Sequence, residues 1–235
     1  MPLDPAIVGK LKSVSTATLT TVLLKKGLRR VAMRGPRPFG PASEGRVVGR
    51  AFTMRFVPAR EDLATPESWS SPRSTRSAIE LMEAGDIAVV DAMGATGAGI
   101  FGDILCARMM KRGVAGLVTD GVLRDGAGVA AIGLPAWCAG LAAPPSIAEL
   151  TFAGWGDPIG CGGVCVLPGD VVVADGDGAV VIPETQLAAV VAEAIEQEAL
   201  EAWIMKEVER GAALPGLYPA NPETRARYEA ERGRK

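Results

Sequence analysis

The stretch from Gly102 to Asp125 constrains the fold of this chain more than any other. It opens with a carboxylate at Asp103 and closes with Arg124 and Asp125, with twenty residues between Asp103 and Arg124. These twenty residues read as one helix, one strand and one turn. That is about the length a chain needs to leave one edge of a parallel sheet and return to it. The spacing therefore predicts that two acids and a guanidinium meet at one sheet edge.

Neighbouring segments extend the same pattern. The run IAVVDA at 87–92 is continuously apolar, which is typical of a parallel strand covered on both faces. A helix is expected over 103–112, because apolar residues recur on one side and a glycine follows, and VAGLVTDG at 114–121 is the returning strand. A short helix over 126–132 and a strand over 134–140 continue the alternation. The middle of the chain is predicted to consist of consecutive βαβ units.

The N-terminal part contains helices and a long polar segment. The segment at 57–77 is polar and aperiodic, and it is longer than an ordinary connection, so it is either a functional lid or mobile. A loop at 28–46 carries Arg29, Arg30, Arg34 and Arg37. It could bind an anion, but a solvated or subunit-facing surface is preferred. The remaining expected elements are helices over 3–13, 16–26 and 77–84 and a strand over 47–56.

The C-terminal part changes from alternating units to hairpins. Residues 161–183, CGGVCVLPGDVVVADGDGAVVIP, predict three strands joined by short turns, and hence antiparallel pairing. A long helix is expected over 184–210. We predict one α/β domain over 1–210 with helical extensions at both ends. The tail at 211–235 is expected to lie across a neighbouring subunit or to fray.

The chain contains no histidine. This absence excludes Ser-His and Cys-His nucleophiles, imidazole acid–base catalysis and His-ligated zinc or iron. Cys161 and Cys165 are separated by three residues, but zinc would need two further ligands, so we interpret them as structural thiols. The available chemistry is therefore that of carboxylates, Arg, Lys, hydroxyls and thiols, with an oxygen-loving metal as a possible addition.

Charge and hydropathy narrow the class of protein. The net charge of −2 gives no electrostatic argument for nucleic acid or an anionic membrane as a partner. No apolar run reaches the roughly 18–20 residues that span a bilayer. The N-terminus MPLDPAIVGK lacks the basic start and apolar block of a secretory signal. We expect a soluble cytoplasmic protein.

The sheet edge at 102–125 has two interpretations. Carboxylates without histidine or thiolate ligands suit Mg²⁺ or Mn²⁺, and a 2-oxo acid would complete the metal shell with its carboxylate and keto oxygens. Gly102 would permit close backbone approach, and the first amides of the following helix are suited to an anionic group. On the other interpretation, Asp103 is only a helix-start acid and Arg124 belongs to an ordinary ion pair. Spacing alone does not decide between them.

The motifs carry a family resemblance. GDIL at 102–105, followed by Arg124-Asp125 in the setting GVAGLVTDGVLRD, resembles the class II pyruvate aldolases that cleave 4-hydroxy-4-methyl-2-oxoglutarate. These enzymes belong to the RraA-like superfamily, which also contains the regulator of ribonuclease E activity. PGDVVVADGDGAVVIP at 168–183 is similar to the same family. The likeness covers roughly residues 15–210.

The resemblance implies a fold and a reaction. It implies a β/β/α swivelling-type domain that assembles as homotrimers or homohexamers. It also implies divalent-metal-dependent retro-aldol cleavage to pyruvate, with oxaloacetate decarboxylation as a second activity, and Mg²⁺ or Mn²⁺ as cofactor. The alternative within the superfamily is a non-catalytic regulator that binds a ribonuclease or another protein.

The resemblance also assigns roles to residues. Asp103 and Arg124 are expected to be catalytic, with Asp103 orienting a water that acts as base or proton donor. Asp125 is the expected metal ligand, largely through waters. The expected substrate-binding residues are Gly102, Asp103, Ile104, Leu105 and Arg124.

Two features depart from or extend the family pattern. Many members carry an acid three residues after the Arg-Asp aspartate, where this chain has Gly128. The family also uses a glutamate from the C-terminal region of an adjacent subunit. Glu196, Glu198 and Glu201 are all candidates for it here, and the sequence does not choose among them.

Overall fold

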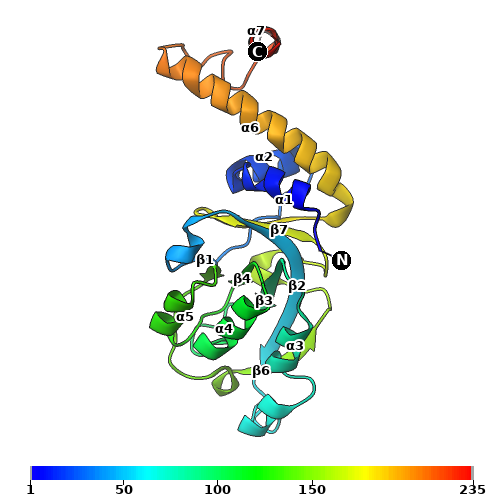
Figure 1. The fold of residues 1–235 in the computed structure, drawn as a ribbon, viewed down its shortest axis with the longest axis vertical. Helices are drawn as coiled ribbons and strands as arrows, with labels where there is room; N and C mark the ends of the chain where they lie inside the picture. Colours follow the sequence, from blue (N-terminus) through cyan, green and yellow to red (C-terminus); the bar gives the residue numbers. More distant parts are fainter. Residues whose placement is uncertain (1, 234–235) are drawn as a thin grey trace.

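The computed structural model describes residues 2–233, which form one mixed eight-stranded sheet with helices on both sides (Figure 1). The strand order is β1-β5-β4-β3-β2-β7-β8, and β6 also pairs with β2. The strands are β1 (Arg37–Phe39), β2 (Val47–Pro58), β3 (Asp86–Asp91), β4 (Gly116–Thr119), β5 (Ala136–Cys138), β6 (Leu150–Trp155), β7 (Val171–Asp175) and β8 (Gly178–Ile182).

The long strand β2 joins the parallel and antiparallel parts of the sheet. Its first residues pair antiparallel with β7 and its last residues antiparallel with β6. Its middle residues pair parallel with β3, which continues in parallel through β4 to β5. The parallel strands therefore end at one edge, to which the βαβ crossovers return.

Capping residues define where several helices begin. The side chains of Asp4, Ser15, Ser74 and Asn221 accept backbone N–H groups of the first turns that follow them. The helices are α1 (Pro5–Lys12), α2 (Thr16–Lys25), α3 (Thr75–Leu81), α4 (Asp103–Lys111), α5 (Gly126–Ile132), α6 (Leu187–Glu209) and α7 (Pro222–Arg232), and 3₁₀ turns include η2 (Pro66–Ser70), η3 (Ser146–Ala148) and η4 (Cys161–Gly163).

The core is divided into layers by the curl of the sheet. Helices α3, α4 and α5 pack on one face of the parallel strands. The other face, which includes Val89 and Val118, packs against Val172 and Val181 of the β7–β8 hairpin. Helices α1, α2 and α6 cover the outer face of that hairpin (Figure 1). This α/β arrangement, with parallel βαβ units, a C-terminal hairpin and helical extensions, confirms the predicted fold class.

Several predicted elements need correction. Residues 161–183 contain two strands where three were predicted, because Gly162 and Gly163 adopt positive φ and only one bridge, between Ile159 and Val166, forms before β7. The loop predicted over 28–46 contains the short strand β1, and β6 was not predicted at all. The other predicted elements are present with ends shifted by a few residues.

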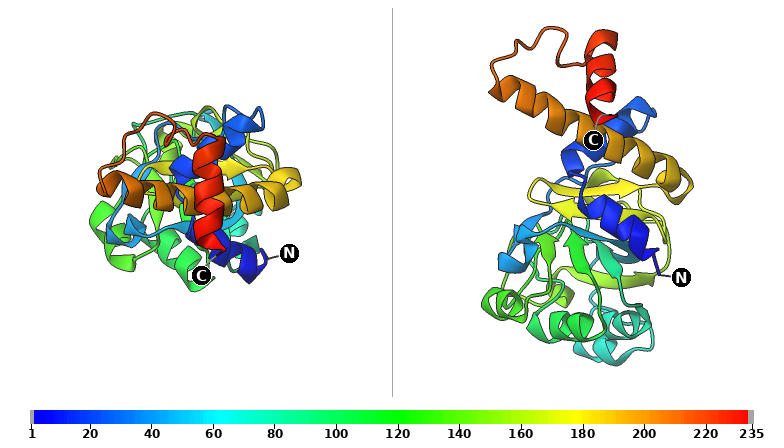
Figure 2. Two further views of the ribbon diagram at one scale, coloured as in Figure 1. Left: turned by 90° about the horizontal axis from the view of Figure 1, so that it is seen from above. Right: turned by 45° about the horizontal axis from the view of Figure 1, so that its top comes forward.

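The tail forms a helix that packs on its own chain. Helix α7 crosses α6 (Figure 2), and Tyr228 and Leu217 are buried against Leu200 and Ile204. Two guanidiniums, from Arg210 and Arg227, pair with the carboxylate of Glu207 at 2.6 Å each. The prediction that the tail lies across a neighbouring subunit or frays is not tested by these contacts and stays a prediction. Within residues 2–233, no helix is long and apolar enough to cross a bilayer.

Candidate functional site

The site is built where parallel pairing continues beyond the ends of the strands. The Ile100 amide donates to the Val122 carbonyl and the Arg124 amide donates to the Phe101 carbonyl, both at 2.9 Å. The Leu123 amide donates to the Gly140 carbonyl at 3.0 Å. The segment after β4 is thus held between its two neighbours by backbone hydrogen bonds. These bonds fix Arg124 beside the start of α4, as the crossover length predicts.

Two glycines allow this close packing. A Cβ at Gly99 would lie 2.8 Å from the Arg124 amide nitrogen, and a Cβ at Gly102 would lie 2.4 Å from Oδ2 of Asp125. Both separations are shorter than side chains tolerate. Glycine at these positions therefore lets the backbone before α4 lie directly against the Arg124-Asp125 pair.

Asp103 is the first residue of α4. Its Oδ1 accepts the Ile104 amide at 2.7 Å, which leaves Oδ2 without a hydrogen-bond donor among residues 2–233. On the far side, a Cβ at Gly128 would lie 2.9 Å from Oδ2 of Asp103. A side chain at position 128, such as the acid that the resemblance implies there, would therefore lie directly against Asp103. Because Gly128 has no side chain, the Asp103 carboxylate can occupy this space.

Arg124 and Asp125 form a neighbouring ion pair. Nε of Arg124 donates to Oδ2 of Asp125 at 3.2 Å, and the two side chains are 35% and 44% exposed. Asp125 has φ 53° and ψ 42°, in the left-handed region that few residues other than glycine adopt. Such strained backbone persists where the surroundings hold it and is frequent at functional sites. The pair leaves the terminal nitrogens of Arg124 available to a ligand.

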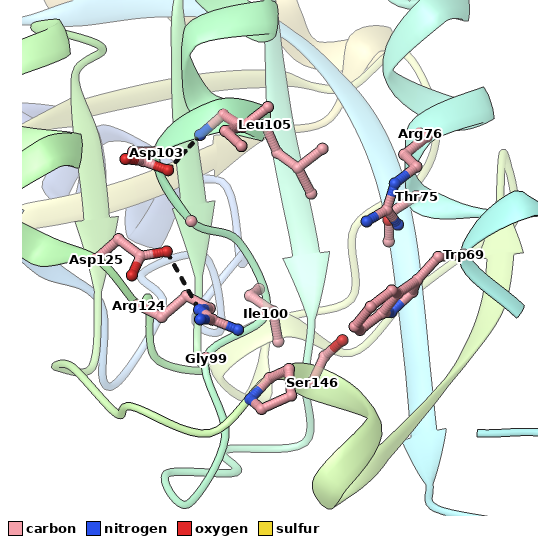
Figure 3. Close-up of a pocket in the computed structure, with 13 residues that line it drawn as sticks. Trp69, Thr75, Arg76, Gly99, Ile100, Asp103, Leu105, Arg124, Asp125 and Ser146 are labelled. Atoms are coloured by element: carbon pink, nitrogen blue, oxygen red, sulfur yellow. Dashed lines mark hydrogen bonds and ion pairs between the residues drawn. The ribbon is translucent and has the colours of Figure 1, made fainter. Parts of the chain in front are cut away.

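All the predicted site residues line one pocket of about 240 Å³ (Figure 3). Gly102, Asp103, Ile104, Leu105, Arg124 and Asp125 form one side of it. The structure thus brings together every residue that the sequence assigned to the site. The roles given to them remain predictions.

The opposite side of the pocket was not predicted. It consists of Trp69, Thr75 and Arg76, with Ser146 below (Figure 3), and Pro145 also lines the pocket. Trp69 belongs to η2, so the polar segment at 57–77 forms a pocket wall. No periodicity marks these residues in the sequence, and the available signal was a single tryptophan in a polar turn before a helix.

The three candidate glutamates lie elsewhere in this chain. All are on α6, at the end of the molecule away from α3 and α4 (Figure 1). Glu196 pairs with Arg232, Glu198 accepts the Ser15 amide at 3.4 Å, and Glu201 accepts the Gln197 side-chain amide at 2.7 Å. None of them lines the pocket of its own chain, so their place in a neighbouring site stays a prediction.

The pocket offers carboxylates and no reactive thiol. Burial raises the pKa of Cys106 to about 12, helped by the charge of Asp103, so this thiol remains protonated at neutral pH. Within residues 2–233, no three metal-ligating side chains are grouped closely enough to enclose an ion. A metal here would therefore depend on one or two carboxylates, with waters and substrate completing its shell.

Comparisons with known proteins agree on one family. Residues 16–181 match the RraA-like family model, described as Aldolase/RraA. A candidate 4-hydroxy-4-methyl-2-oxoglutarate aldolase of Halalkalibacterium halodurans is 40% identical over 105 residues, covering 43% of this chain and 48% of that protein. The chain spans about half the length of this curated relative, so the likeness to it is partial.

Two solved structures are similar over most of their length. One is Streptomyces coelicolor RraAS2, described as an unusual member of the RNase ES inhibitor RraA protein family. It is 36% identical, with a TM-score of 0.76, and the match covers 86% of this chain and 97% of that one. An uncharacterized protein from Pseudomonas syringae is 25% identical with a TM-score of 0.78, covering 93% and 99%.

Proposed function

The chain belongs to the RraA-like (Aldolase/RraA) family, and from this premise we propose that it is a divalent-metal-dependent lyase of 2-oxo acids. It would cleave a 4-hydroxy-2-oxo acid of the 4-hydroxy-4-methyl-2-oxoglutarate type by retro-aldol reaction to pyruvate, with oxaloacetate decarboxylation as a side activity. The observation that carries the proposal is the meeting of Asp103, Arg124 and Asp125 in one pocket.

A divalent cation fits the donors of this pocket. Mg²⁺ and Mn²⁺ bind through one or two carboxylates while keeping several waters, and Asp125 offers such a carboxylate. The left-handed backbone of Asp125 and its ion pair with Arg124 hold that carboxylate beside Gly102. When bound, the cation would polarise the keto group and stabilise the negative charge of the pyruvate enolate.

Arg124 and the start of α4 would bind the pyruvate part of the substrate. The terminal nitrogens of Arg124 can donate two hydrogen bonds to a carboxylate. Leu105 lies in the first turn of a nine-residue helix, where amides have no acceptor within the helix. These donors would fix the 2-oxo acid with its C3–C4 bond near Asp103.

Asp103 would accept and donate the protons of the reaction. Through a water, its carboxylate would take the proton from the C4 hydroxyl, so that the C3–C4 bond breaks and its electron pair passes into the enolate of pyruvate. The same group would then return a proton to C3. With oxaloacetate, carbon dioxide leaves and the same enolate forms, which is why both activities are expected of one site.

The proposal is tested by measuring pyruvate release from 4-hydroxy-4-methyl-2-oxoglutarate and from oxaloacetate with Mg²⁺ or Mn²⁺. Removal of the metal with EDTA should abolish release, and added metal should restore it. Arg124→Ala should lose most of the rate, because it removes the substrate's charged partner. A metal-independent rate, or an Arg124→Ala variant as fast as wild type, would contradict the proposal.

A second candidate function is a non-catalytic regulator that binds a ribonuclease or another protein. The similarity to RraAS2, whose family is described as RNase ES inhibitors, favours it. A ribonuclease pull-down would test it: retention by wild type and by Asp125→Ala alike, with no lyase activity in either, would support the regulator over the lyase.

We also propose that the protein is a homotrimer or homohexamer. In such an assembly Glu196, Glu198 or Glu201 of one subunit would complete the pocket of its neighbour. Light scattering should give three or six times the chain mass of 24.3 kDa. A monomer with full lyase activity would sink this proposal.

A further inference from the structure

A second guanidinium faces the pocket from the wall opposite Arg124. Arg76 and Trp69 both line the pocket, and the guanidinium carbon of Arg76 lies 5.3 Å from the centre of the Trp69 ring. Figure 3 shows this pair across the pocket from Arg124 and Asp125. The pocket therefore has one arginine on each side.

Arg76 has no anionic partner among residues 2–233, and its guanidinium lies over the Trp69 ring. Other arginines nearby are paired: Arg108 and Arg112 both bind the carboxylate of Glu80. Stacking on an aromatic ring uses the face of a guanidinium and leaves its in-plane N–H donors available. Trp69 thus supports the Arg76 guanidinium, whose N–H donors remain open to a carboxylate.

The charges of the pocket lining point to the same ligand. Among residues 2–233 of this chain, the charged side chains that line the pocket are Asp103, Asp125, Arg76 and Arg124. Arg124 pairs with Asp125, whereas Arg76 has no carboxylate partner within these residues. A second carboxylate on the substrate would pair with Arg76, whereas a substrate with one carboxylate leaves Arg76 unpaired.

We propose that Arg76, supported by Trp69, is the residue that binds the carboxylate at the far end of a dicarboxylic 4-hydroxy-2-oxo acid. This inference rests on the proposed lyase function. Arg124 holds the carboxylate beside the keto group, and Arg76 holds the one on the fragment that leaves as the carbonyl product. The volume of about 240 Å³ is below the roughly 300–1,000 Å³ of sites for drug-sized ligands, as expected for a small acid.

The test compares two substrates that differ only at the far end. 4-Hydroxy-2-oxoglutarate carries a carboxylate where 4-hydroxy-2-oxopentanoate carries a methyl group. Arg76→Met should lower kcat/KM for the dicarboxylate by about 10- to 100-fold, the usual effect of losing one charge-assisted hydrogen-bonded pair. It should change kcat/KM for the monocarboxylate by less than about threefold. An unchanged ratio between the two substrates would overturn the inference.

Arg73 provides the matched control. It lies three residues earlier, stacks on Trp155 at 5.7 Å, and its Nε donates to the Ala153 carbonyl, away from the pocket of Asp103 and Arg124. Arg73→Met should leave the substrate ratio as in wild type. A loss of dicarboxylate preference in Arg73→Met and not in Arg76→Met would place the far carboxylate elsewhere and overturn the inference.

Equilibrium binding separates this inference from the proposed function. With Mg²⁺, calorimetry should show that wild type binds 2-oxoglutarate more tightly than 2-oxopentanoate, and that Arg76→Met removes the difference. If no substrate is cleaved but this binding pattern appears, the lyase proposal fails and the inference stands as a ligand specificity. If substrates are cleaved and Arg76→Met keeps the preference, the inference alone fails.

Discussion

Four aspartates lie at or beyond the ends of strands β3 and β4 near the same edge of the sheet, and they form two unlike pairs. Asp91 and Asp120 are only 8% and 7% exposed. Asp103 and Asp125 line the open pocket on the side of α4. In sequence all four look alike, since each is an acid just after a strand or glycine-rich loop.

In the buried pair, each carboxylate oxygen accepts a backbone amide. Asp120 accepts the amides of Ala92 at 2.8 Å and Gly162 at 3.0 Å. Asp91 accepts the amides of Met93 at 3.0 Å and Gly160 at 3.2 Å. Burial raises the pKa of the neighbouring Cys161 well above its usual value, and the charge of Asp120 adds to the effect. These two carboxylates tie η4 and the loop after β3 to the sheet.

The pocket pair is left incomplete. Asp103 accepts one amide and Asp125 accepts one guanidinium nitrogen, so each retains an oxygen for another partner. A carboxylate whose acceptor sites are filled by the backbone stabilises the fold, and one with sites left open can act on a ligand. The difference lies in the hydrogen-bond donors around each acid rather than in the acid itself.

The largest effect that this comparison predicts is on catalysis at Asp125. Asparagine keeps the shape and tolerates the left-handed backbone but removes the charge. Asp125→Asn should lower the rate of pyruvate release by about 10²- to 10³-fold, the size typical of losing one electrostatic group of a transition state. Its urea midpoint should stay close to that of wild type. If Asp125→Asn had a much lower urea midpoint while its folded fraction was fully active, Asp125 would have a structural role and not a role in the reaction.

A smaller effect, on stability, is predicted at Asp120. Asp120→Ala leaves the buried amides of Ala92 and Gly162 without acceptors, which should cost about 2–4 kcal/mol of unfolding free energy. Urea denaturation followed by circular dichroism measures it. Asp103→Ala is the control and should cost under about 1 kcal/mol, because its carboxylate is not enclosed. Equal losses for the two variants would remove the distinction between the pairs.

The smallest effect concerns Asp175, a third kind of aspartate at the opposite end of the sheet. Burial raises its pKa, but hydrogen bonds from Thr16 and Asp177 and the charge of Arg46 outweigh burial, so the pKa is lowered from its usual 3.8. A carboxyl group whose pKa is lower in the folded than in the unfolded protein stabilises the fold at a pH above its unfolded pKa. This stabilisation is lost as the pH falls through the folded pKa. Asp175→Asn should therefore reduce stability by about 1 kcal/mol at pH 7.

The pH profile supplies the check on Asp175. Unfolding free energies measured from pH 7 down to pH 3 should fall more for wild type than for Asp175→Asn, so that the two curves converge in acid. Curves that stay parallel would show that the Thr16 contact does not depend on the charge of Asp175.

The crossover half of the site could be predicted from sequence because its determinants are local. A continuous apolar run, a helix of fixed length and a returning strand place Asp103 and Arg124 at one edge by geometry alone. Helix α5 begins and ends where the pattern predicts, at Gly126 and Ile132. The alternation of strand-like and helix-like apolar patterns, together with the positions of the glycines, is thus enough to predict this half of the site.

The other half could not be predicted in the same way. Trp69 and Arg76 reach the pocket because α3 packs beside β6 and η2 packs beside α3. Strand β6 itself pairs with β2 across an irregularity between Arg55 and Phe56. Tertiary pairing of this kind leaves no period in the sequence. Helix α7, by contrast, had a readable signal, because Asn221 caps it and proline follows at its first position.

The left-handed backbone of Asp125 has a consequence for how this protein tolerates mutation. Position 125 requires a residue that accepts φ 53°, and the proposed metal-binding role would also require a negative charge. Asparagine and glycine meet the first demand and glutamate meets the second, whereas aspartate meets both. Variants at this position should therefore fall into two classes. Some would fold but lack the charge and the activity, and others would keep the charge but strain the backbone. In a saturation library scored for protein abundance and for pyruvate release, aspartate alone should score high in both measurements.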